Sequence, residues 1–380
     1  MRHQFGNRIE SLRILLLGVV CLLVSACAKP EQALIGVDNP ELSAEQVPGT
    51  KSHEIYIMTT RAPASDDAIL FSGNRSGTLE FAKVTVTLPP NHQPGNIERP
   101  RRLPPDPKKE MTVVDPVRFA NEAEVISDMN QAFRAADTER SVLVFVHGYN
   151  TTFTDAVLRI GQFVEDSGFD GVPVLFTWAS AGKLTDYVYD INSALAARSA
   201  LIEASDVLVK TDTRTVNLVA HSMGNLLTVE AMKQGQLQGR FDSSGKLRNI
   251  ILASADIDVD VFAEQMSVFD PNQRKFYVLI SEDDKALNVS RFLARGVNRV
   301  GDADVAQLDA LGVTVIDLTT VKDTNSTNHT KFADSPEVVQ IIGGEMLKGD
   351  SLHTAPTDPG VLGNIFKDLT NATQSIADPG

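Results

Sequence analysis

The sequence is poor in cysteine and in positive charge, and both shortages narrow what the protein can be. Only two of the 380 residues are cysteines, Cys21 and Cys27, so neither a disulfide framework nor a cysteine-based metal cluster can form. Lysine and arginine number 35 against 49 acidic residues, which gives a formal net charge of −14. A phosphate backbone demands clustered cations, so this balance argues against a nucleic-acid partner.

An apolar run near the N-terminus is too short to be a comfortable membrane span. It covers residues 14–23 and follows a segment with three arginines. The run closes on residues 24–27, Val-Ser-Ala-Cys, which resemble the lipobox of bacterial lipoproteins. The resemblance implies that residues 1–26 are a lipoprotein signal peptide, cleaved before Cys27, whose thiol is then acylated. A plain signal peptide and an uncleaved anchor are the alternatives.

The residue after the lipobox bears on whether the protein is retained in the inner membrane or sent to the outer membrane. Ala28 stands where an inner-membrane retention signal would place Asp. The resemblance therefore implies a protein of the cell envelope, lipid-anchored in the outer membrane and facing the periplasm.

Composition divides the remaining chain into a spacer, a folded domain and a tail. Residues 27–52 hold prolines and glycines without periodicity, which predicts a flexible tether. The folded domain is predicted over residues 53–348 and begins with strands at 53–60 and 79–88. A Pro-rich loop at 89–110 cannot be regular structure. Residues 349–380 are predicted to be a C-terminal tail.

From residue 117 onward helical and strand patterns alternate, which predicts one α/β domain. The strands are short and almost wholly apolar, as in a mostly parallel sheet with helices on both faces. A Rossmann fold is the competing topology, but no Gly-x-Gly-x-x-Gly follows a predicted strand, and there is no P-loop sequence. Strands are predicted at residues 142–146, 172–178, 213–220, 247–253, 275–281 and 313–318. Helices are predicted at residues 117–136, 154–167, 187–209, 225–233, 287–295 and 336–347.

Residues 220–224, Ala-His-Ser-Met-Gly, carry the strongest chemical signal. They lie between the strand ending at Val219 and a helix predicted to begin near Asn225. A serine on such a tight strand-to-helix turn has a strained backbone and an exposed hydroxyl, which is the setting of a nucleophile. Small residues are needed two positions to either side, and Ala220 is a mild departure from the usual Gly. A chance match or an inactive turn is the alternative to a nucleophilic Ser222.

A second motif, Val-His-Gly-Tyr-Asn at residues 146–150, ends the strand that begins at residue 142. Acyl transfer needs two amide donors aimed at the developing oxyanion. The backbone N–H groups of Met223 and Tyr149 are the predicted donors. His147 is predicted to be a structural residue of this loop and His221 a buried neighbour, since neither follows the serine in the chain.

These motifs resemble the α/β-hydrolase superfamily, and more closely its lipase- and esterase-like bacterial branch of unknown function. The resemblance rests on residues 146–150, 177–180, 220–224 and 281–287, and it covers roughly residues 53–345. Thr59-Thr60-Arg61 and the Pro-rich loop also look like the N-terminal extension of that branch. The resemblance implies a hydrolase sheet of about eight strands and a triad in the order Ser, acid, His.

The acid is expected just after the strand at 275–281, where Asp283 and Asp284 lie. The branch pattern Ser-x-x-Asp-x-Ala-Leu selects Asp284. Asp283 is the next candidate, followed by Asp256 or Asp258 after the preceding strand. Either Asp283 or Asp284 could instead be the N-cap of the helix that follows.

The base is expected after the last strand, and His329 lies 11 residues beyond it. His353 also follows the acid, but it falls in the Pro-rich tail. Ser222, Asp284 and His329 are therefore the predicted triad of a serine hydrolase that acts on carboxylic esters or thioesters.

No metal or redox cofactor is expected, because the chemistry needs none and the His and Cys spacings offer no metal cage. The predicted partners are an ester or acyl substrate, either a small molecule or a lipid, and the membrane through the N-terminal lipid anchor. The chain between residues 253 and 275 is too short for a large cap domain, so the loop at 179–189 is the predicted wall of the site. A non-catalytic envelope lipoprotein that uses the hydrolase fold for binding is the alternative.

Overall fold

Nine strands form one sheet in the part of the chain that the computed structural model describes, residues 31–135, 140–270, 275–321 and 327–347. Their order is β3-β2-β1-β5-β4-β6-β7-β8-β9. The first three strands pair antiparallel, and every other pairing is parallel, which confirms the predicted mostly parallel sheet. The strands are β1 Lys51–Pro63, β2 Phe71–Leu88, β3 Thr112–Phe119, β4 Ser141–Val146, β5 Val172–Thr177, β6 Thr215–His221, β7 Leu247–Ala253, β8 Phe276–Ile280 and β9 Thr314–Asp317.

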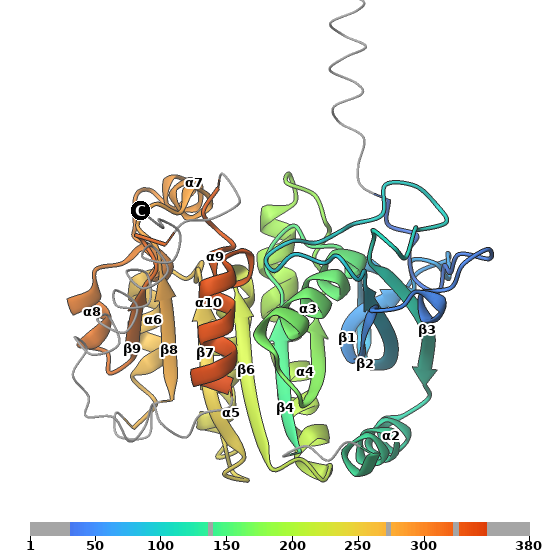
Figure 1. Cartoon of the computed structure of the whole chain (residues 1–380). Coiled ribbons are helices and arrows are strands. Elements are labelled where there is room, and N and C mark those ends of the chain that lie inside the picture. The colour runs from blue at the N-terminus through green and yellow to red at the C-terminus, as the bar shows by residue number, and fades with distance from the viewer. Residues whose placement is uncertain (1–30, 136–139, 271–274, 322–326, 348–380) are drawn as a thin grey trace, which may run out of the picture. The chain divides into compact units, whose positions relative to one another are not determined.

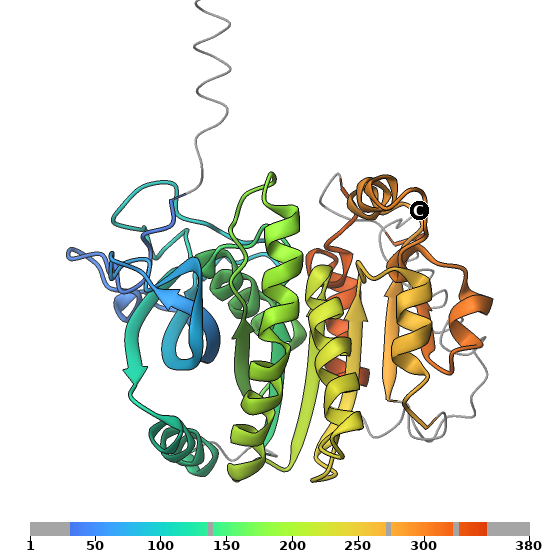
Figure 2. The same ribbon diagram turned by 180° about the vertical axis from the view of Figure 1, so that it is seen from behind.

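Helices cover both faces of this sheet, as the sequence predicts. Helices α4, α5 and α6 lie on one face, and α3, α9 and α10 on the other (Figures 1 and 2). Short elements fill the ends, with α7 and α9 at the upper edge in Figure 1. The helices are α2 Glu122–Ala135, α3 Phe153–Ser167, α4 Tyr187–Lys210, α5 Met223–Leu237, α6 Val259–Met266, α7 Lys285–Leu293, α8 Val305–Asp309, α9 Lys331–Asp334 and α10 Pro336–Ile341, followed by η4 Ile342–Leu347.

Strand β4 shows why its residues are apolar throughout. Val142, Val144 and Val146 pack into the core under α4 and α5, whereas Leu143 and Phe145 pack into the core under α3. Successive side chains of a strand point to opposite faces, so a strand with helices on both sides must be apolar at every position. Packing on both faces therefore holds the central strands in place, and the polar residues discussed below lie at the ends of these strands.

Two predictions for the N-terminal half are wrong. The helix predicted from residue 117 begins at Glu122, because residues up to Phe119 extend the edge strand β3 against β2. The predicted flexible tether is anchored to the domain at several points, since Leu34, Ile35, Ala44 and Val47 are buried. Backbone hydrogen bonds from Ile35 N to Ala68 O and from Gly36 N to Val113 O hold this segment.

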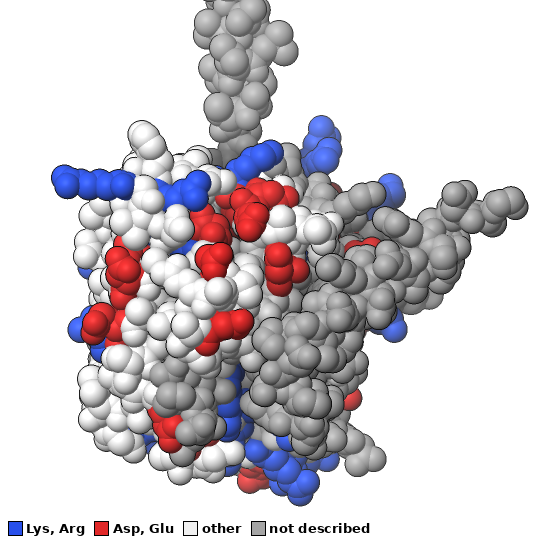
Figure 3. All heavy atoms as spheres, turned by 90° about the vertical axis from the view of Figure 1, so that its left-hand side faces the viewer, with Lys and Arg blue, Asp and Glu red and all other residues white. Residues whose placement is uncertain are grey.

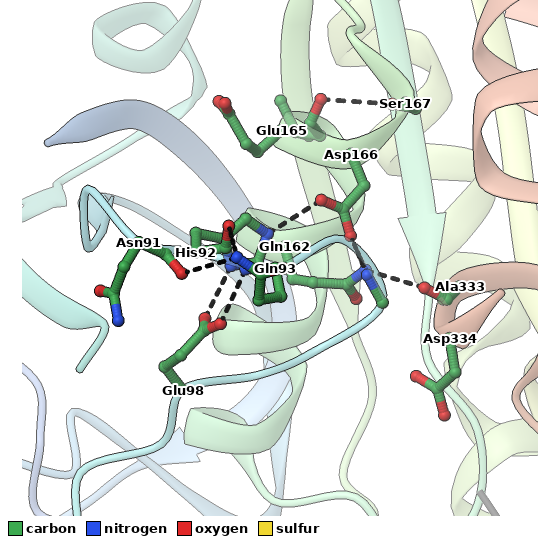
Figure 4. A network of polar contacts seen from close by, with 12 residues as sticks. Asn91, His92, Gln93, Glu98, Gln162, Glu165, Asp166, Ser167, Ala333 and Asp334 are labelled. Carbon is green, nitrogen blue, oxygen red and sulfur yellow. Dashed lines mark hydrogen bonds and ion pairs between the residues drawn. The ribbon is translucent and has the colours of Figure 1, made fainter. Parts of the chain in front are cut away.

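The Pro-rich loop 89–110 has no regular structure, as predicted, yet it is held firmly against α3. His92 lies between Glu98 Oε2 and Asp166 Oδ1, at 2.7 and 2.9 Å (Figure 4). The backbone N–H of Gly95 donates to Asp166 Oδ2 at 2.7 Å. The loop therefore reaches the upper edge of the sheet, where Ile97 and Arg99 enter the wall of a cleft.

Several predictions concern residues outside the described ranges: the signal peptide 1–26, Cys27, and the tail 349–380 with His353. Within those ranges, no helix has both the length and the apolar composition that crossing a bilayer requires.

Candidate active site

Ser222 lies at the junction of β6 and α5 with an unusual backbone. Its φ of 53° and ψ of −123° are sterically costly for a residue with a side chain. The neighbouring backbone holds this conformation, since Ser222 N donates to Ala253 O and Ser222 O accepts from Asn225 N and Nδ2. This is the strained strand-to-helix turn that the sequence predicts, and it directs the side chain into a cleft.

Two glycines make the turn sterically possible. A Cβ on Gly224 would lie 2.4 Å from His147 O, and a Cβ on Gly148 would lie 2.8 Å from Ser222 Cβ. Both distances are shorter than real contacts, so α5 and the loop after β4 can approach the serine only with glycine at these positions.

His329 and Asp284 come together from separate elements. His329 Nδ1 is 2.7 Å from Asp284 Oδ2, and the Asp284 side chain is only 1% exposed. Since a carboxylate accepts, Nδ1 is the nitrogen that donates to Asp284, and Nε2 is the nitrogen left to face another partner. The other oxygen of Asp284 accepts from the backbone N–H groups of Ala286 and Leu287 at the start of α7. Asp284 is thus both the N-cap of α7 and the partner of His329.

The other candidate acids are engaged elsewhere. Asp283 pairs with the buried Lys331 at 2.7 Å. Partial burial alone would raise the pKa of Asp283, but hydrogen bonds from Lys331 and Ser281 hold that pKa below its usual value. Asp256 accepts from the hydroxyls of Tyr187 and Ser290. Asp258 caps α6.

Ser222 and His329 line the same cleft, although no hydrogen bond joins them in the described part of the chain. The ring of His221 packs against the rings of His329 and of the buried Phe332, with centroid distances of 4.7 and 4.9 Å. Burial and the nearby His329 lower the pKa of His221 well below its ordinary value, so this ring stays neutral. His221 is the neighbour of the site that the sequence predicts, but it is half-buried rather than fully buried.

The loop after β4 carries His147 and the predicted oxyanion donor Tyr149. His147 is buried, and its ring stacks on Trp178. Burial and the charge of Arg61 lower the pKa of His147 to about 3, so it is neutral. Its Nδ1–H donates to Gly148 O at 2.9 Å. Nothing in the described structure accepts from the backbone N–H of Tyr149 or of Met223. Tyr149 lines the cleft, and Met223 directly follows Ser222, which also lines it.

Arg61 supports this loop from β1. Its side chain is buried and donates to Thr177 Oγ1, to Ser180 O and to Thr151 O. It also lies 3.3 Å from His147 Nε2. Burial lowers the pKa of Arg61 to about 10, which still leaves the guanidinium charged at neutral pH.

Asp190 of α4 also holds the loop after β4, through hydrogen bonds to its carboxylate. Its carboxylate, which is fully buried, accepts from Asn150 N, Ala181 N and Ser180 Oγ. Sequence reasoning missed the roles of Arg61 and Asp190. The sequence did carry a signal for each role. Arg61 is a charged residue in a largely apolar strand, and Asp190 is a charged residue on the buried face of a helix.

Ser222, His329 and the loop after β4 line one cleft of about 740 Å³. Its lining includes Tyr187 and Leu184 from the loop that the sequence predicts to form a wall. It also includes two arginines, Arg99 and Arg159, which pair with Asp155 and Asp334, respectively. Within the described ranges, no cluster of three or more His, Cys, Asp or Glu side chains is arranged to hold a metal ion.

Comparison with known proteins gives one family match. The model of the family described as alpha/beta hydrolase of unknown function (DUF900) matches residues 120–345. No curated protein matches the chain.

Solved structures of esterases resemble it at low identity. The monoclinic form of a Pyrobaculum calidifontis esterase is 12% identical over 78% of this chain and 84% of that chain, with a TM-score of 0.35. A fungal esterase from Rhizomucor miehei is 11% identical over 76% of this chain and 77% of its own, with a TM-score of 0.29.

Neighbours this distant carry no argument about activity, so the assignment rests on the family match. That match spans β4, the serine turn, and the Asp284–His329 pair. The chain belongs to the alpha/beta hydrolase family of unknown function.

Proposed function

We propose that the protein is a serine hydrolase that cleaves carboxylic esters or thioesters through Ser222, His329 and Asp284. The proposal rests above all on the 2.7 Å contact between His329 Nδ1 and Asp284 Oδ2, in the cleft that Ser222 also lines. A weakly acidic hydroxyl needs a neighbouring base to become a nucleophile, and this pairing leaves His329 Nε2 free to be that base.

Acylation of the serine is the first half of the reaction. His329 Nε2 takes the hydroxyl proton while Ser222 Oγ attacks the carbonyl carbon of the ester. The backbone N–H groups of Met223 and Tyr149 stabilise the resulting oxyanion. Asp284 stabilises the positive charge on His329. The carbon–oxygen bond to the alcohol then breaks, the alcohol takes the proton from His329, and the acyl group stays on Ser222.

Hydrolysis completes the cycle with the same groups. His329 Nε2 accepts a proton from a water molecule, whose oxygen attacks the acyl carbon. When the tetrahedral intermediate collapses, the proton returns to Ser222 Oγ and the carboxylic acid leaves.

The proposal places this chemistry at the cell envelope. It is supported by the Val-Ser-Ala-Cys sequence that ends at Cys27, which resembles a lipobox. In this proposal acylated Cys27 anchors the enzyme in the outer membrane on the periplasmic side. Cys27→Ser should abolish both acylation with labelled palmitate and normal maturation. If this variant were processed and fractionated as the wild type is, the anchor would be excluded.

A fluorophosphonate probe tests the catalytic proposal, because it reacts only with an activated serine. We expect wild-type protein to be labelled and Ser222→Ala and His329→Ala to remain unlabelled. Ser290→Ala is a matched control, since Ser290 lines the same cleft and should leave labelling intact. Folded wild-type protein that resisted the probe would contradict the hydrolase proposal and favour a binding module.

A further inference from the structure

Large apolar side chains are exposed mainly at one place on the described surface. Six of them are 61–82% exposed, and five of the six lie on the first turn of α4, on the loop before it, or on α7. We call these five the apolar rim: Leu184, Val188, Val289, Phe292 and Leu293. The sixth, Leu237, ends α5 and serves below as a control.

Helix α7 presents its apolar side chains outward. Leu287 and Ser290 face the core and are buried, whereas Val289, Phe292 and Leu293 are 61%, 82% and 61% exposed. A soluble surface helix normally has polar residues on its outer face. The outer face of α7 is therefore suited to an apolar environment.

The apolar rim continues into the cleft. Leu184, Val289 and Leu293 are exposed and also line the cleft that contains Ser222. Val188 and Phe292 extend the same surface outward without lining the cleft. An apolar path thus runs from the outside of the molecule to the serine.

The charges next to the rim differ from those of the whole chain. The formal net charge is −14, yet residues 285–296 contain Lys285, Arg291 and Arg295 and no acidic residue. Arg291 pairs with Asp302 at 3.4 Å. Three acidic residues, 282–284, precede the segment, but Asp284 is buried and Asp283 pairs with Lys331. Near Leu184 and Val188, the positive charge of Lys183 is offset by the negative charge of Asp186. Figure 3 shows Lys and Arg at the upper edge of the face that it displays, with acidic side chains below them. Cations beside an apolar surface favour contact with anionic lipid headgroups.

We propose that the apolar rim docks on the surface of an anionic phospholipid bilayer, from which aliphatic esters pass along the rim to Ser222. A protein bound stably across both sides of the cleft would close the access of substrate to the serine. A fluid lipid surface in the same position would itself supply the substrate. This inference deepens the proposed ester hydrolysis and rests on it only for the transfer of substrate, not for the docking.

Docking can be measured without any catalysis. The chain has a single tryptophan, Trp178, which is fully buried, so a Trp placed on the surface gives a distinguishable signal. Full-length Phe292→Trp is mixed with vesicles of phosphatidylcholine and phosphatidylglycerol that carry brominated acyl chains. We expect its emission to shift to the blue and to be quenched, whereas Leu237→Trp should show neither change.

Two results would overturn the docking proposal. One is equal quenching, or none, in Phe292→Trp and Leu237→Trp. The other is a blue shift of Phe292→Trp that depends on protein concentration in the absence of vesicles, which would indicate that a second copy covers the rim. Neither result bears on the reaction of Ser222 with fluorophosphonate, so failure of docking and failure of the proposed hydrolysis can be told apart.

The transfer of substrate is tested with the double variant Val188→Asp, Phe292→Asp, which changes only rim residues outside the cleft. We expect turnover of a long-chain ester embedded in the vesicles to fall about tenfold, because two apolar contacts with the bilayer are replaced by charges. Turnover of a short, water-soluble ester should be unchanged, and Leu237→Asp should match the wild type on both. An unchanged ratio between the two esters would refute the role of the rim in substrate transfer.

Discussion

Arg61 Nη2 lies 3.3 Å from His147 Nε2, and both side chains are buried. A guanidinium can only donate, so Nε2 accepts and the proton of His147 is on Nδ1. That proton is donated to Gly148 O. In a trans peptide the N–H points opposite to the carbonyl, so the Tyr149 N–H is directed away from His147. Arg61 therefore acts, through His147, on the peptide whose N–H is the proposed oxyanion donor.

This relationship predicts that His147 affects the rate more than substrate binding. His147→Leu removes the donor to Gly148 O and frees the peptide to rotate. We expect kcat for a soluble ester to fall by about 10²–10³-fold, the usual effect of losing one oxyanion donor, with KM little changed. His147→Gln, whose amide can both donate and accept, should retain more of the activity. A folded His147→Leu variant with wild-type kcat would refute this role.

The glycine of the serine turn predicts a steric effect. Gly224→Ala places a Cβ 2.4 Å from His147 O, a backbone atom that cannot easily move. We expect a loss of about 1–3 kcal/mol in the free energy of unfolding, together with most of the activity, because the turn must shift. Gly77→Ala is the control, since nothing lies within 4 Å of its added Cβ. Thermal melting and ester turnover are measured for both variants. A Gly224→Ala protein with the melting temperature and turnover of the wild type would contradict the prediction.

The sheet and the serine turn could be predicted because their signals are local. Apolar strands alternate with helices along the chain, and the serine has small neighbours between a strand and a helix. The acid of the triad could not be assigned from local signals alone, because Asp283 and Asp284 are adjacent and both are suited to cap the following helix. Only the fold shows that one meets His329 and the other meets Lys331.

Long-range contacts account for the remaining errors. Residues 27–52 lack periodicity, yet Leu34 and Ile35 are buried by contacts with segments more than 30 residues away. Arg61 could not be assigned a role because its partners are carbonyl and hydroxyl groups from three other segments, at residues 72, 151 and 177–180. Neither kind of contact leaves a pattern in the neighbouring sequence.

His92 predicts a stability that depends on pH. Burial alone would lower the pKa of His92, but hydrogen bonds to Asp166 and Glu98 raise it to about 9 (Figure 4). A raised pKa means that the protonated ring stabilises the fold. Its contribution should be complete below the unfolded value of about 6.5 and should disappear as the pH rises through about 9.

The difference in the free energy of unfolding between wild type and His92→Gln measures this contribution. Urea unfolding, followed by the emission of Trp178, should show a difference at about pH 6 that has vanished near pH 10. Asn91→Ala, an exposed neighbour, should show no such dependence on pH. A difference that stayed constant over this range would mean that protonation of His92 is not involved.

Asp284→Asn separates chemistry from stability. An asparagine caps a helix about as well as an aspartate, so α7 should keep its N-cap and the free energy of unfolding should change by less than about 1 kcal/mol. The amide favours the wrong tautomer of His329, and we expect kcat to fall by about 10³–10⁴-fold. Ester turnover and thermal melting of the same preparation provide both measurements.

Asp283→Asn is the matched control, because it should have the opposite effects. It removes the carboxylate from Lys331, a side chain that is only 1% exposed. The loss should cost about 1–2 kcal/mol of stability, a reduced value because Asp283 itself is 42% exposed and partly screened by water. Turnover per folded molecule should stay close to that of the wild type, since this carboxylate does not contact His329. If Asp283→Asn abolished turnover while Asp284→Asn did not, the acid would lie one residue earlier, and the 2.7 Å contact of Asp284 with His329 would be structural only.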